Sequence, residues 1–181
     1  EVPVLIEDDG LILCGAGVIS EYLDETRAAE RGLQLIGRSP AERAETRRLI
    51  AWFDERFNAE VTHPVVGEKA IRRFLPREAG GGPPDMPRLR AGIAALKGHL
   101  DYIAELADHR NWLAGNEFSG ADLEAAAHLS CLDFIGEVPW EDAAEVKHWY
   151  QRVKSRPSFR TLLCDHVRGI SPPARYSDLD F

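Results

Sequence analysis

The sequence is poor in cysteine, and its three cysteines lie too far apart along the chain to suggest a disulfide framework. Cys14, Cys131 and Cys164 are odd in number, and the chain contains no Cys-x-x-Cys or Cys/His metal spacing. Disulfide frameworks and structural zinc sites both depend on such spacing. We therefore expect buried free thiols in a reducing cytoplasm and no bound metal.

Long hydrophobic runs and an excess of positive charge are also missing. No uninterrupted apolar stretch approaches the ~20 residues of a membrane-spanning helix, and nothing resembles a signal peptide. The 30 Asp and Glu residues outnumber 22 Lys and Arg, which gives a formal net charge of -8. Such a charge argues against nucleic acid as the main partner. We expect a globular protein that does not insert into a membrane.

A β-hairpin followed by a helix is predicted near the start of the chain. Residues 4–6 and 11–14 are short runs of apolar, β-favouring residues. Asp8-Asp9-Gly10 lies between them and is a turn signal, because Asp and Gly tolerate positive φ angles. Residues 18–23 then carry apolar side chains at helical spacing, which predicts a helix that packs back on the hairpin.

This order of elements strongly resembles the second half of the thioredoxin-like domain in the glutathione transferase superfamily. The resemblance implies a cis peptide bond between Val2 and Pro3. Superfamily members that use glutathione join strand to helix by a Glu/Gln-Ser pair, which binds the γ-glutamyl group together with the helix-start amides. Gly15 and Ala16 stand at those positions here.

The resemblance therefore implies a degenerate glutathione site at Val2, Pro3, Gly15 and Ala16, with no bound cofactor. No catalytic residue is assigned within the chain, and enzymatic activity is the less favoured expectation. The run from Gly15 to Gly17 is interpreted as a tight turn, since its spacing fits no phosphate-binding loop.

The chain also begins inside the domain that it resembles. A hairpin with one helix does not form a stable unit in water, and in the superfamily a β-α-β unit precedes this point. We expect an N-terminally truncated version of a longer protein, whose missing part would carry any catalytic Tyr, Ser or Cys.

The predicted fold is a partial thioredoxin-like α/β unit followed by an all-α helical bundle. The helix after the hairpin is expected to end at Leu23, where a polar stretch begins. The expected units are residues 1–25 (C-terminal half of a thioredoxin-like domain), 26–38 (linker), 39–168 (all-α domain) and 169–181 (extended tail).

An N-cap that starts a helix, and a later break in that helix, are predicted early in the all-α domain. Ser39 is followed by a proline and, three residues on, by Glu42, which forms a capping-box pattern. His63-Pro64 is expected to interrupt the helix, because proline lacks an amide donor and constrains the preceding residue. For His63 a structural role is favoured over a catalytic one.

Residues 76–87 form the clearest insertion, with three glycines and four prolines. Such a segment cannot continue a helix, and we expect it to be exposed. A flexible connection and a partner-binding loop are both open interpretations, since loops of this length are often functional. If the loop binds a partner, Arg72, Arg73, Arg77 and Leu89 are the candidate contacts.

Two further segments support the superfamily resemblance. Apolar residues at steps of three and four along residues 89–106 predict a long central helix with a core-facing stripe. Ser119 and Asp122 form a second capping-box pattern, which resembles the buried N-cap of a superfamily helix, where the Asp is structural and not catalytic. The run from Trp149 to Phe159 resembles the closing pattern of that domain.

The tail, residues 169–181, contains a Pro-Pro pair that favours extended backbone. Leu179 and Phe181 alternate with Asp178 and Asp180. Disordered tails seldom show this alternation, so docking on a partner or on the protein's own body is favoured. Asp178, Leu179 and Asp180 are candidate partner contacts.

Three features, the Gly15-Ala16 replacement, the Pro/Gly loop (residues 76–87) and the tail, together resemble those of FtsZ-binding division proteins of this superfamily in alphaproteobacteria. The resemblance implies a cytoplasmic homodimer at the division site. It would bind FtsZ, the tubulin-like division GTPase, and curve or bundle its filaments without glutathione chemistry. A glutathione-dependent transferase or isomerase is the alternative, and an adaptor for another cytoplasmic complex is a third possibility.

Overall fold

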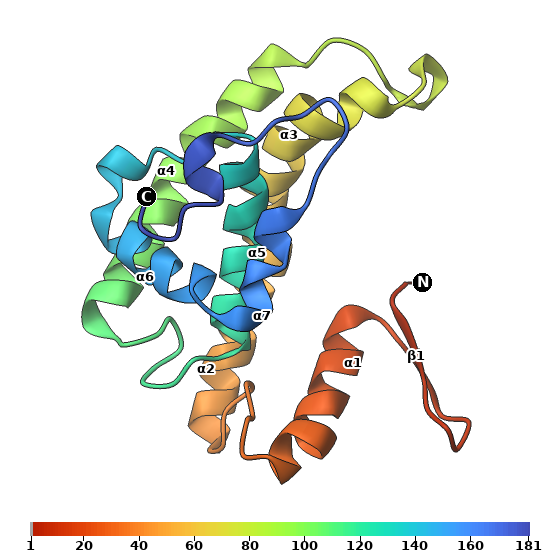
Figure 1. The fold of residues 1–181 in the computed structure, drawn as a ribbon, viewed down its shortest axis with the longest axis vertical. Coiled ribbons are helices and arrows are strands. Elements are labelled where there is room, and N and C mark those ends of the chain that lie inside the picture. Colours follow the sequence, from red (N-terminus) through yellow and green to blue (C-terminus); the bar gives the residue numbers. More distant parts are fainter. Residues whose placement is uncertain (1) are drawn as a thin grey trace.

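A computed structural model describes residues 2–181 and shows a small hairpin–helix unit beside a larger helical domain (Figure 1). The strands are β1 (Val4–Ile6) and β2 (Ile12–Cys14), and the α-helices are α1 (Ala16–Leu23), α2 (Pro40–Ala51), α3 (His63–Val66), α4 (Met86–His109), α5 (Gly120–Phe134), α6 (Ala144–Lys154) and α7 (Pro157–Arg160). Wider π-helical segments are Asp24–Ala28, Trp52–Thr62 and Gly67–Ile71, and 3-10 turns are Arg72–Phe74, Arg77–Ala79, Trp140–Asp142, Leu162–Cys164 and Ala174–Tyr176. This order confirms the predicted fold class.

The hairpin forms as predicted. Strands β1 and β2 pair antiparallel, with Leu5 opposite Leu13 at the centre of the register. Gly10 closes the turn at a φ of 89°, in the left-handed region that favours glycine, and the Val2–Pro3 bond is cis. Apolar side chains remain in solvent on both strands, with Ile6 68% and Ile12 60% exposed.

Helix α1 is longer than the sequence predicts. Gly15 is its N-cap, so Ala16 and Gly17 belong to the helix and do not form a tight turn. The backbone then continues through Leu23 as π-helical turns to Ala28. The buried carboxylate of Asp24 accepts the backbone amides of Leu35 and Ile36, and this pairing ties the helical extension to the segment that leads into α2.

The expected break at His63-Pro64 does not occur. Thr62 and His63 both keep right-handed helical backbone angles, and α3 follows directly on the π-helical segment Trp52–Thr62. A proline normally clashes with the carbonyl four residues earlier in a regular α-helix. The wider turns before Pro64 relieve this constraint, because π-helical bonding shifts the acceptor to the fifth preceding residue.

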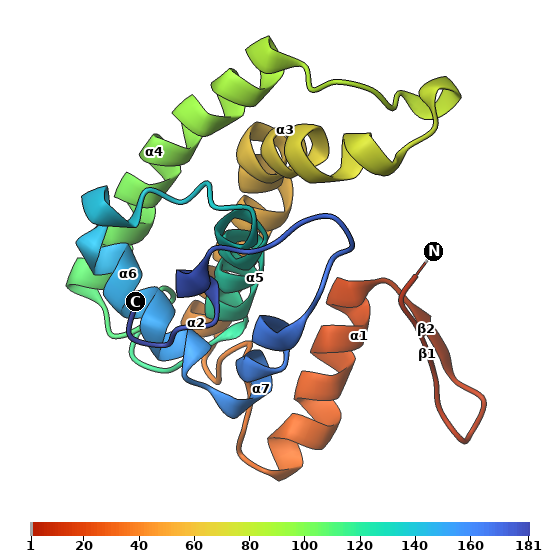
Figure 2. The ribbon, with the colours of Figure 1, turned by 45° about the horizontal axis from the view of Figure 1, so that its top comes forward.

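In the helical domain α5 packs against α2, the π-helical segment Trp52–Thr62 and α6, and α4 packs against that π-helical segment and α6 (Figure 2). Ser39 and Glu42 form the predicted capping box at α2, and α4 is the predicted long central helix. Fully buried side chains in this core include Leu49, Phe53, Phe57, Val61, Ile103, Leu129, Val146 and Tyr150. Among residues 2–181 the structure has no helix long and apolar enough to cross a membrane.

The thiols are free, as expected, but they are not buried. Cys14, Cys131 and Cys164 are each exposed. Cys14 ends a strand of the open hairpin, Cys131 lies on a solvent-facing side of α5, and Cys164 lies in a surface turn. Sequence position did not predict this exposure, because free cysteine usually packs in cores as a small apolar residue.

Candidate functional site

The corner between β2 and α1 offers backbone and no polar side chain. Gly15 donates its amide to the carbonyl oxygen of Pro3 at 3.0 Å, and no side chain of residues 2–181 caps the helix start. A Cβ atom placed at Gly15 or Gly17 would meet no atom within 4 Å. The start of α1 could attract an anion through its free amides, but Val2, Pro3 and Ala16 add no group that would select glutathione.

Two arginines beside the Pro/Gly loop, Arg72 and Arg88, pair with one buried carboxylate. Glu68 pairs with Arg72, whose Nη1 lies 2.9 Å from its Oε2, and with Arg88, whose Nη1 lies 3.5 Å from its Oε1. The backbone amide of Asp85 donates to the same carboxylate at 2.8 Å. Glu68 therefore holds the end of the loop to the helix, and Arg72, which neutralises this carboxylate, is only partly free for a partner.

Arg73 and Arg77 are more available. Both are exposed and, within residues 2–181, neither forms an ion pair. The guanidinium of Arg73 lies 5.5 Å from the ring centre of Phe74, and its Nη2 would lie 3.7 Å from a Cβ placed at Gly169. The loop residues therefore border the start of the tail, and Ile71 and Phe74 expose apolar surface next to them.

Leu89 is not a surface residue. Its side chain is 5% exposed and belongs to the core cluster. Leu89 lies on the inward stripe of α4, which the periodicity of residues 89–106 predicts for core positions. Its assignment as a partner contact is therefore corrected, and the exposed part of the loop is residues 76–87, as expected.

Asp122 is a structural centre in the helical domain. Its carboxylate accepts the backbone amide and the hydroxyl of Ser119, each at 3.0 Å. It also accepts the amide of Leu113 at 2.9 Å and the indole Nε1–H of Trp149 at 2.8 Å. All four donors compensate a carboxylate with no exposed surface, so this residue serves the fold and not catalysis.

The tail docks on the protein's own helical domain, and Lys154 holds it there. The Nζ of Lys154 donates to the main-chain oxygens of Asp178 at 2.6 Å and Arg175 at 3.2 Å. The same ammonium lies 4.1 Å from the ring centre of Phe181. A lysine with no exposed surface is rare unless its charge is compensated, and here two carbonyl dipoles and an aromatic face compensate it.

Aromatic packing completes the tail dock. Phe181 lies edge-to-face against Trp140, with ring centres 5.1 Å apart, and beside Tyr150 at 6.3 Å. Gln151 donates to the main-chain oxygen of Phe181 at 3.1 Å. Tyr176 is buried nearby, and its hydroxyl is 2.9 Å from that of Ser130.

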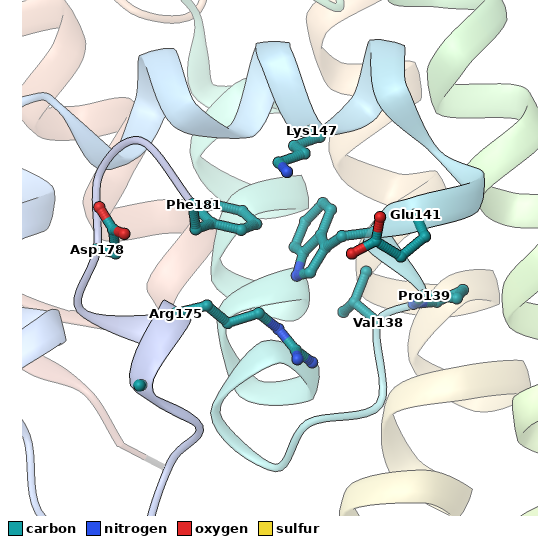
Figure 3. Close-up of a pocket in the computed structure, with 9 residues that line it drawn as sticks. Val138, Pro139, Glu141, Lys147, Arg175, Asp178 and Phe181 are labelled. Atoms are coloured by element: carbon teal, nitrogen blue, oxygen red, sulfur yellow. The ribbon is translucent and has the colours of Figure 1, made fainter.

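A cavity of about 470 Å³ opens between the docked tail and the turn before α6. Figure 3 shows Lys147 reaching into it from the helix and Arg175 from the tail side. It is lined by Val138, Pro139, Trp140, Glu141, Lys147, Ala174, Arg175, Asp178 and Phe181. The lining carries both signs of charge, which gives it no clear preference for one ligand charge.

The charges under the tail are coupled. Asp133 is fully buried, accepts the indole N–H of Trp140 at 2.8 Å, and lies 3.7 Å from the Nε of Arg175. Burial raises the pKa of Asp133, opposed by Trp140, Lys154 and Arg175. Burial lowers the pKa of Lys154, opposed by Asp133 and Asp178. The opposite charges favour each other's ionised form, so the tail contacts depend on both.

Asp178 and Asp180 are exposed and Leu179 is half-buried. The amide of Asp180 donates to the carboxylate of Asp178 at 3.0 Å, which fixes the outward turn of this segment. Figures 1 and 2 both place the end of the tail beside α6 and the Pro/Gly loop at the far end of α4. The two groups of candidate residues therefore form separate surfaces.

Lys154 is the residue that sequence reasoning missed. It follows Val153 in an amphipathic helix and lies among other charged residues, so its pattern is that of an ordinary surface lysine. Only the arrival of a segment more than twenty residues later in the chain buries it. No local signal distinguishes such a lysine before the tail is placed.

The described fold matches known proteins along most of its length. Residues 63–157 match the family model of the glutathione S-transferase C-terminal domain. In this range lie α3, α4, α5 and α6, together with the Asp122 cap.

Individual relatives cover nearly the whole chain. FtsZ-localized protein A of Caulobacter vibrioides is 47% identical over 182 residues, covering 99% of this chain and 77% of the relative. The structure of FzlA from C. crescentus has a TM-score of 0.88 at 46% identity and covers 98% of this chain and 76% of its own. A glutathione S-transferase structure from Rhodospirillum rubrum has a TM-score of 0.91 at 50% identity, covering 100% and 78%.

Proposed function

The chain belongs to the glutathione S-transferase family, and we propose that within it the protein binds FtsZ filaments and performs no glutathione chemistry. In this role it curves or bundles the filaments and resides at the division site. The observation that carries the proposal is the 47% identity, along 99% of the chain, with a protein named for its localisation with FtsZ.

The corner between β2 and α1 supports the non-enzymatic part. Glutathione has a charged γ-glutamyl end that polar side chains at this corner would have to hold. Gly15 and Ala16 provide only backbone amides there. Backbone amides at a helix start attract anions in general, but they do not distinguish glutathione from other anions.

The tail supports the binding part. Lys154 and the aromatic residues around Phe181 hold the tail in one position. Asp178 and Asp180 are thereby presented outward as a preformed surface. A preformed surface loses less conformational entropy on binding than a mobile tail would. We place the main contact with FtsZ here and a second contact at Arg73 and Arg77 on the loop.

A homodimer would explain how such a binder acts on filaments. A two-fold dimer presents two copies of one surface. Binding two filament subunits at once gains affinity through effective concentration. A fixed angle between the two copies would then impose a curvature on one filament or connect two filaments into a bundle.

Co-sedimentation with polymerised FtsZ tests the proposal. The protein is expected to pellet with FtsZ polymers at micromolar concentration and to remain in the supernatant when FtsZ is kept unpolymerised. Electron microscopy of the same samples is expected to show curved or bundled filaments. If no protein pellets with the polymers, the proposal is wrong.

Charge reversal tests the surface. The double change Asp178→Lys and Asp180→Lys is expected to weaken binding by about tenfold or more, which corresponds to roughly 1.4 kcal/mol. The matched control is Asp101→Lys with Asp108→Lys, since both carboxylates are exposed on α4. Equal loss of binding in the two double variants would contradict the role of the tail.

A glutathione-dependent transferase or isomerase is the second candidate. It is favoured by the R. rubrum structure, which is named a glutathione S-transferase and is 50% identical. Retention on immobilised glutathione, followed by elution with free glutathione, would support it. Conjugation of glutathione to a generic electrophile above the uncatalysed rate would establish it. An adaptor for another complex would show neither activity and would also fail to pellet with FtsZ.

A further inference from the structure

Three metal-ligating side chains meet on the side of the helical domain that faces α1. Glu124 and His128 lie one turn apart on α5, and Asp54 comes from the π-helical segment Trp52–Thr62. One ligand atom from each of the three lies within 4.8 Å of the others. The Nε2 of His128 is 3.7 Å from the Oε1 of Glu124. None of the three contributes to the tail surface.

The imidazole of His128 is held in place from behind. The hydroxyl of Thr62 lies 2.8 Å from its Nδ1, and the ring of Phe57 packs against it with centres 5.5 Å apart. When Nδ1–H donates to Thr62, the lone pair of Nε2 faces the two carboxylates. Metal-binding histidines are commonly oriented by such a bond from the other ring nitrogen.

The residue types of the cluster suit a cation. One imidazole and two carboxyl groups each offer a ligand atom, and these atoms lie within 4.8 Å of one another. Imidazole nitrogen and carboxylate oxygen are both ligands of divalent transition metals.

The cluster opens on a cleft that has room for a cation with further ligands. A cleft of about 930 Å³ lies between α1 and the helical domain, and Asp54 and Glu124 are on its wall. Figure 1 shows α1 standing beside α2 and the lower end of α5. Three protein ligands with open positions toward a cleft is the arrangement of a zinc site that exchanges its remaining ligand.

We propose that Asp54, Glu124 and His128 form a binding site for one divalent transition-metal ion, with Zn²⁺ as the best match. Zn²⁺ accepts imidazole nitrogen together with carboxylate oxygen. Bond lengths of about 2.0–2.1 Å in a tetrahedral site require ligand atoms roughly 3.3 Å apart. The three ligand atoms, which lie within 4.8 Å of one another, must therefore approach more closely when the ion binds. The site is independent of the proposed binding to FtsZ.

Isothermal titration of the 181-residue chain with ZnCl₂ tests the site. The three exposed thiols also bind zinc, so the titration uses a variant in which Cys14, Cys131 and Cys164 are changed to Ser. One Zn²⁺ is expected to bind per chain. Zinc is also expected to raise the melting temperature, because a ligand that binds the folded state stabilises it.

Two variants remove one ligand each with little change in shape. Glu124→Gln and His128→Gln in the same background are each expected to weaken zinc binding by at least about tenfold. The matched control is His109→Gln, which changes the histidine of an exposed Asp-His pair on α4. A circular dichroism spectrum and melting temperature of each variant establish that it is folded before titration.

Thr62→Val tests the orientation of His128 and leaves all three metal ligands in place. It is expected to weaken zinc binding by roughly tenfold while leaving its stoichiometry at one, because it takes away only the orienting bond. The proposal is overturned if the thiol-free chain binds no zinc saturably. It is also overturned if folded Glu124→Gln and His128→Gln proteins bind zinc as tightly as the His109→Gln control.

Discussion

The ammonium of Lys154 lies 2.6 Å from the main-chain oxygen of Asp178. The two residues belong to different parts of the molecule, since one ends helix α6 and the other lies in the tail. Their hydrogen bond joins the buried ammonium of Lys154 to the C-terminal tail, which in the sequence looks like a simple extension. The position of the tail is thereby set by the helical domain.

Replacing Lys154 by Met tests whether this bond holds the tail. The methionine fills a similar volume, but the carbonyl oxygens of Arg175 and Asp178 lose their donor. We expect the free energy of unfolding to fall by about 1–2 kcal/mol and amide hydrogen exchange in residues 174–181 to accelerate. Mass spectrometry of exchanged peptides measures both the tail and the rest of the chain.

Lys97→Met is the control for the Lys154 change. Lys97 is exposed, and within residues 2–181 its side chain pairs only with Asp101 on the surface of α4. It should leave exchange of the tail unchanged. Unaltered exchange of residues 174–181 in Lys154→Met would show that the aromatic packing and the bonds from Gln151 and Ser130 hold the tail without Lys154.

Asp122→Ala is expected to be among the most destabilising single changes in the chain. It would leave the amides of Leu113 and Ser119 and the indole N–H of Trp149 buried without an acceptor. We expect a loss of about 3–5 kcal/mol in urea denaturation. Asp122→Asn keeps one acceptor oxygen and should lose less. A loss below 1 kcal/mol for the alanine variant, close to that of the exposed Asp108→Ala, would contradict the structural role.

Glu45 should make the stability sensitive to acid. Its carboxylate contacts Arg48 at 2.7 Å and Arg110 at 2.6 Å, which joins α2 to the residue after α4. The hydrogen bond from Arg48 is the main cause that lowers the pKa of Glu45 from 4.5 to about 2, and Arg110 adds to it. The folded state therefore holds this carboxylate ionised at a pH where the unfolded chain binds a proton.

The sign follows from that difference in proton binding. The stabilisation by Glu45 is fully present above pH 4.5 and is lost as the pH falls toward 2. After allowance for solvent screening we expect it to amount to about 1 kcal/mol. Urea denaturation between pH 2 and 6 should show a flatter profile for Glu45→Gln than for the wild type. Parallel profiles would contradict this prediction, and the exposed Glu105→Gln serves as control.

Leu89→Ala tests whether Leu89 is a core residue or a partner contact. Because Leu89 is 5% exposed, we expect the change to lower the free energy of unfolding by about 2–4 kcal/mol. The affinity of the folded protein for FtsZ polymers should not change. A variant with unchanged stability but weaker co-sedimentation would restore Leu89 as a partner contact.

Local signals in the sequence were sufficient for the regular elements. The Asp-Gly turn predicted the hairpin, the capping patterns at Ser39 and Ser119 predicted two helix starts, and the apolar stripe in residues 89–106 predicted α4. Each of these signals involves residues within one or two turns of one another, so the local sequence is enough to predict the element.

The features that sequence reasoning missed depend on residues far apart in the chain. Pro64 continues a helix because the preceding turns widen, which no rule for proline alone anticipates. Lys154 becomes buried only when the tail docks. Glu124 and His128 show helical spacing in the sequence, but Asp54 joins them from another helix. The exposure of the three cysteines was likewise decided by how distant segments pack.

The tail is held through main-chain oxygens and one terminal aromatic ring. The carboxylate of Asp178 also supports the charge of Lys154. The exposed side chain of Asp180 makes none of these contacts and can be exchanged without weakening them. A protein of this kind can acquire a new binding preference through a few substitutions at the exposed positions of the tail, while the contacts that position the tail are kept.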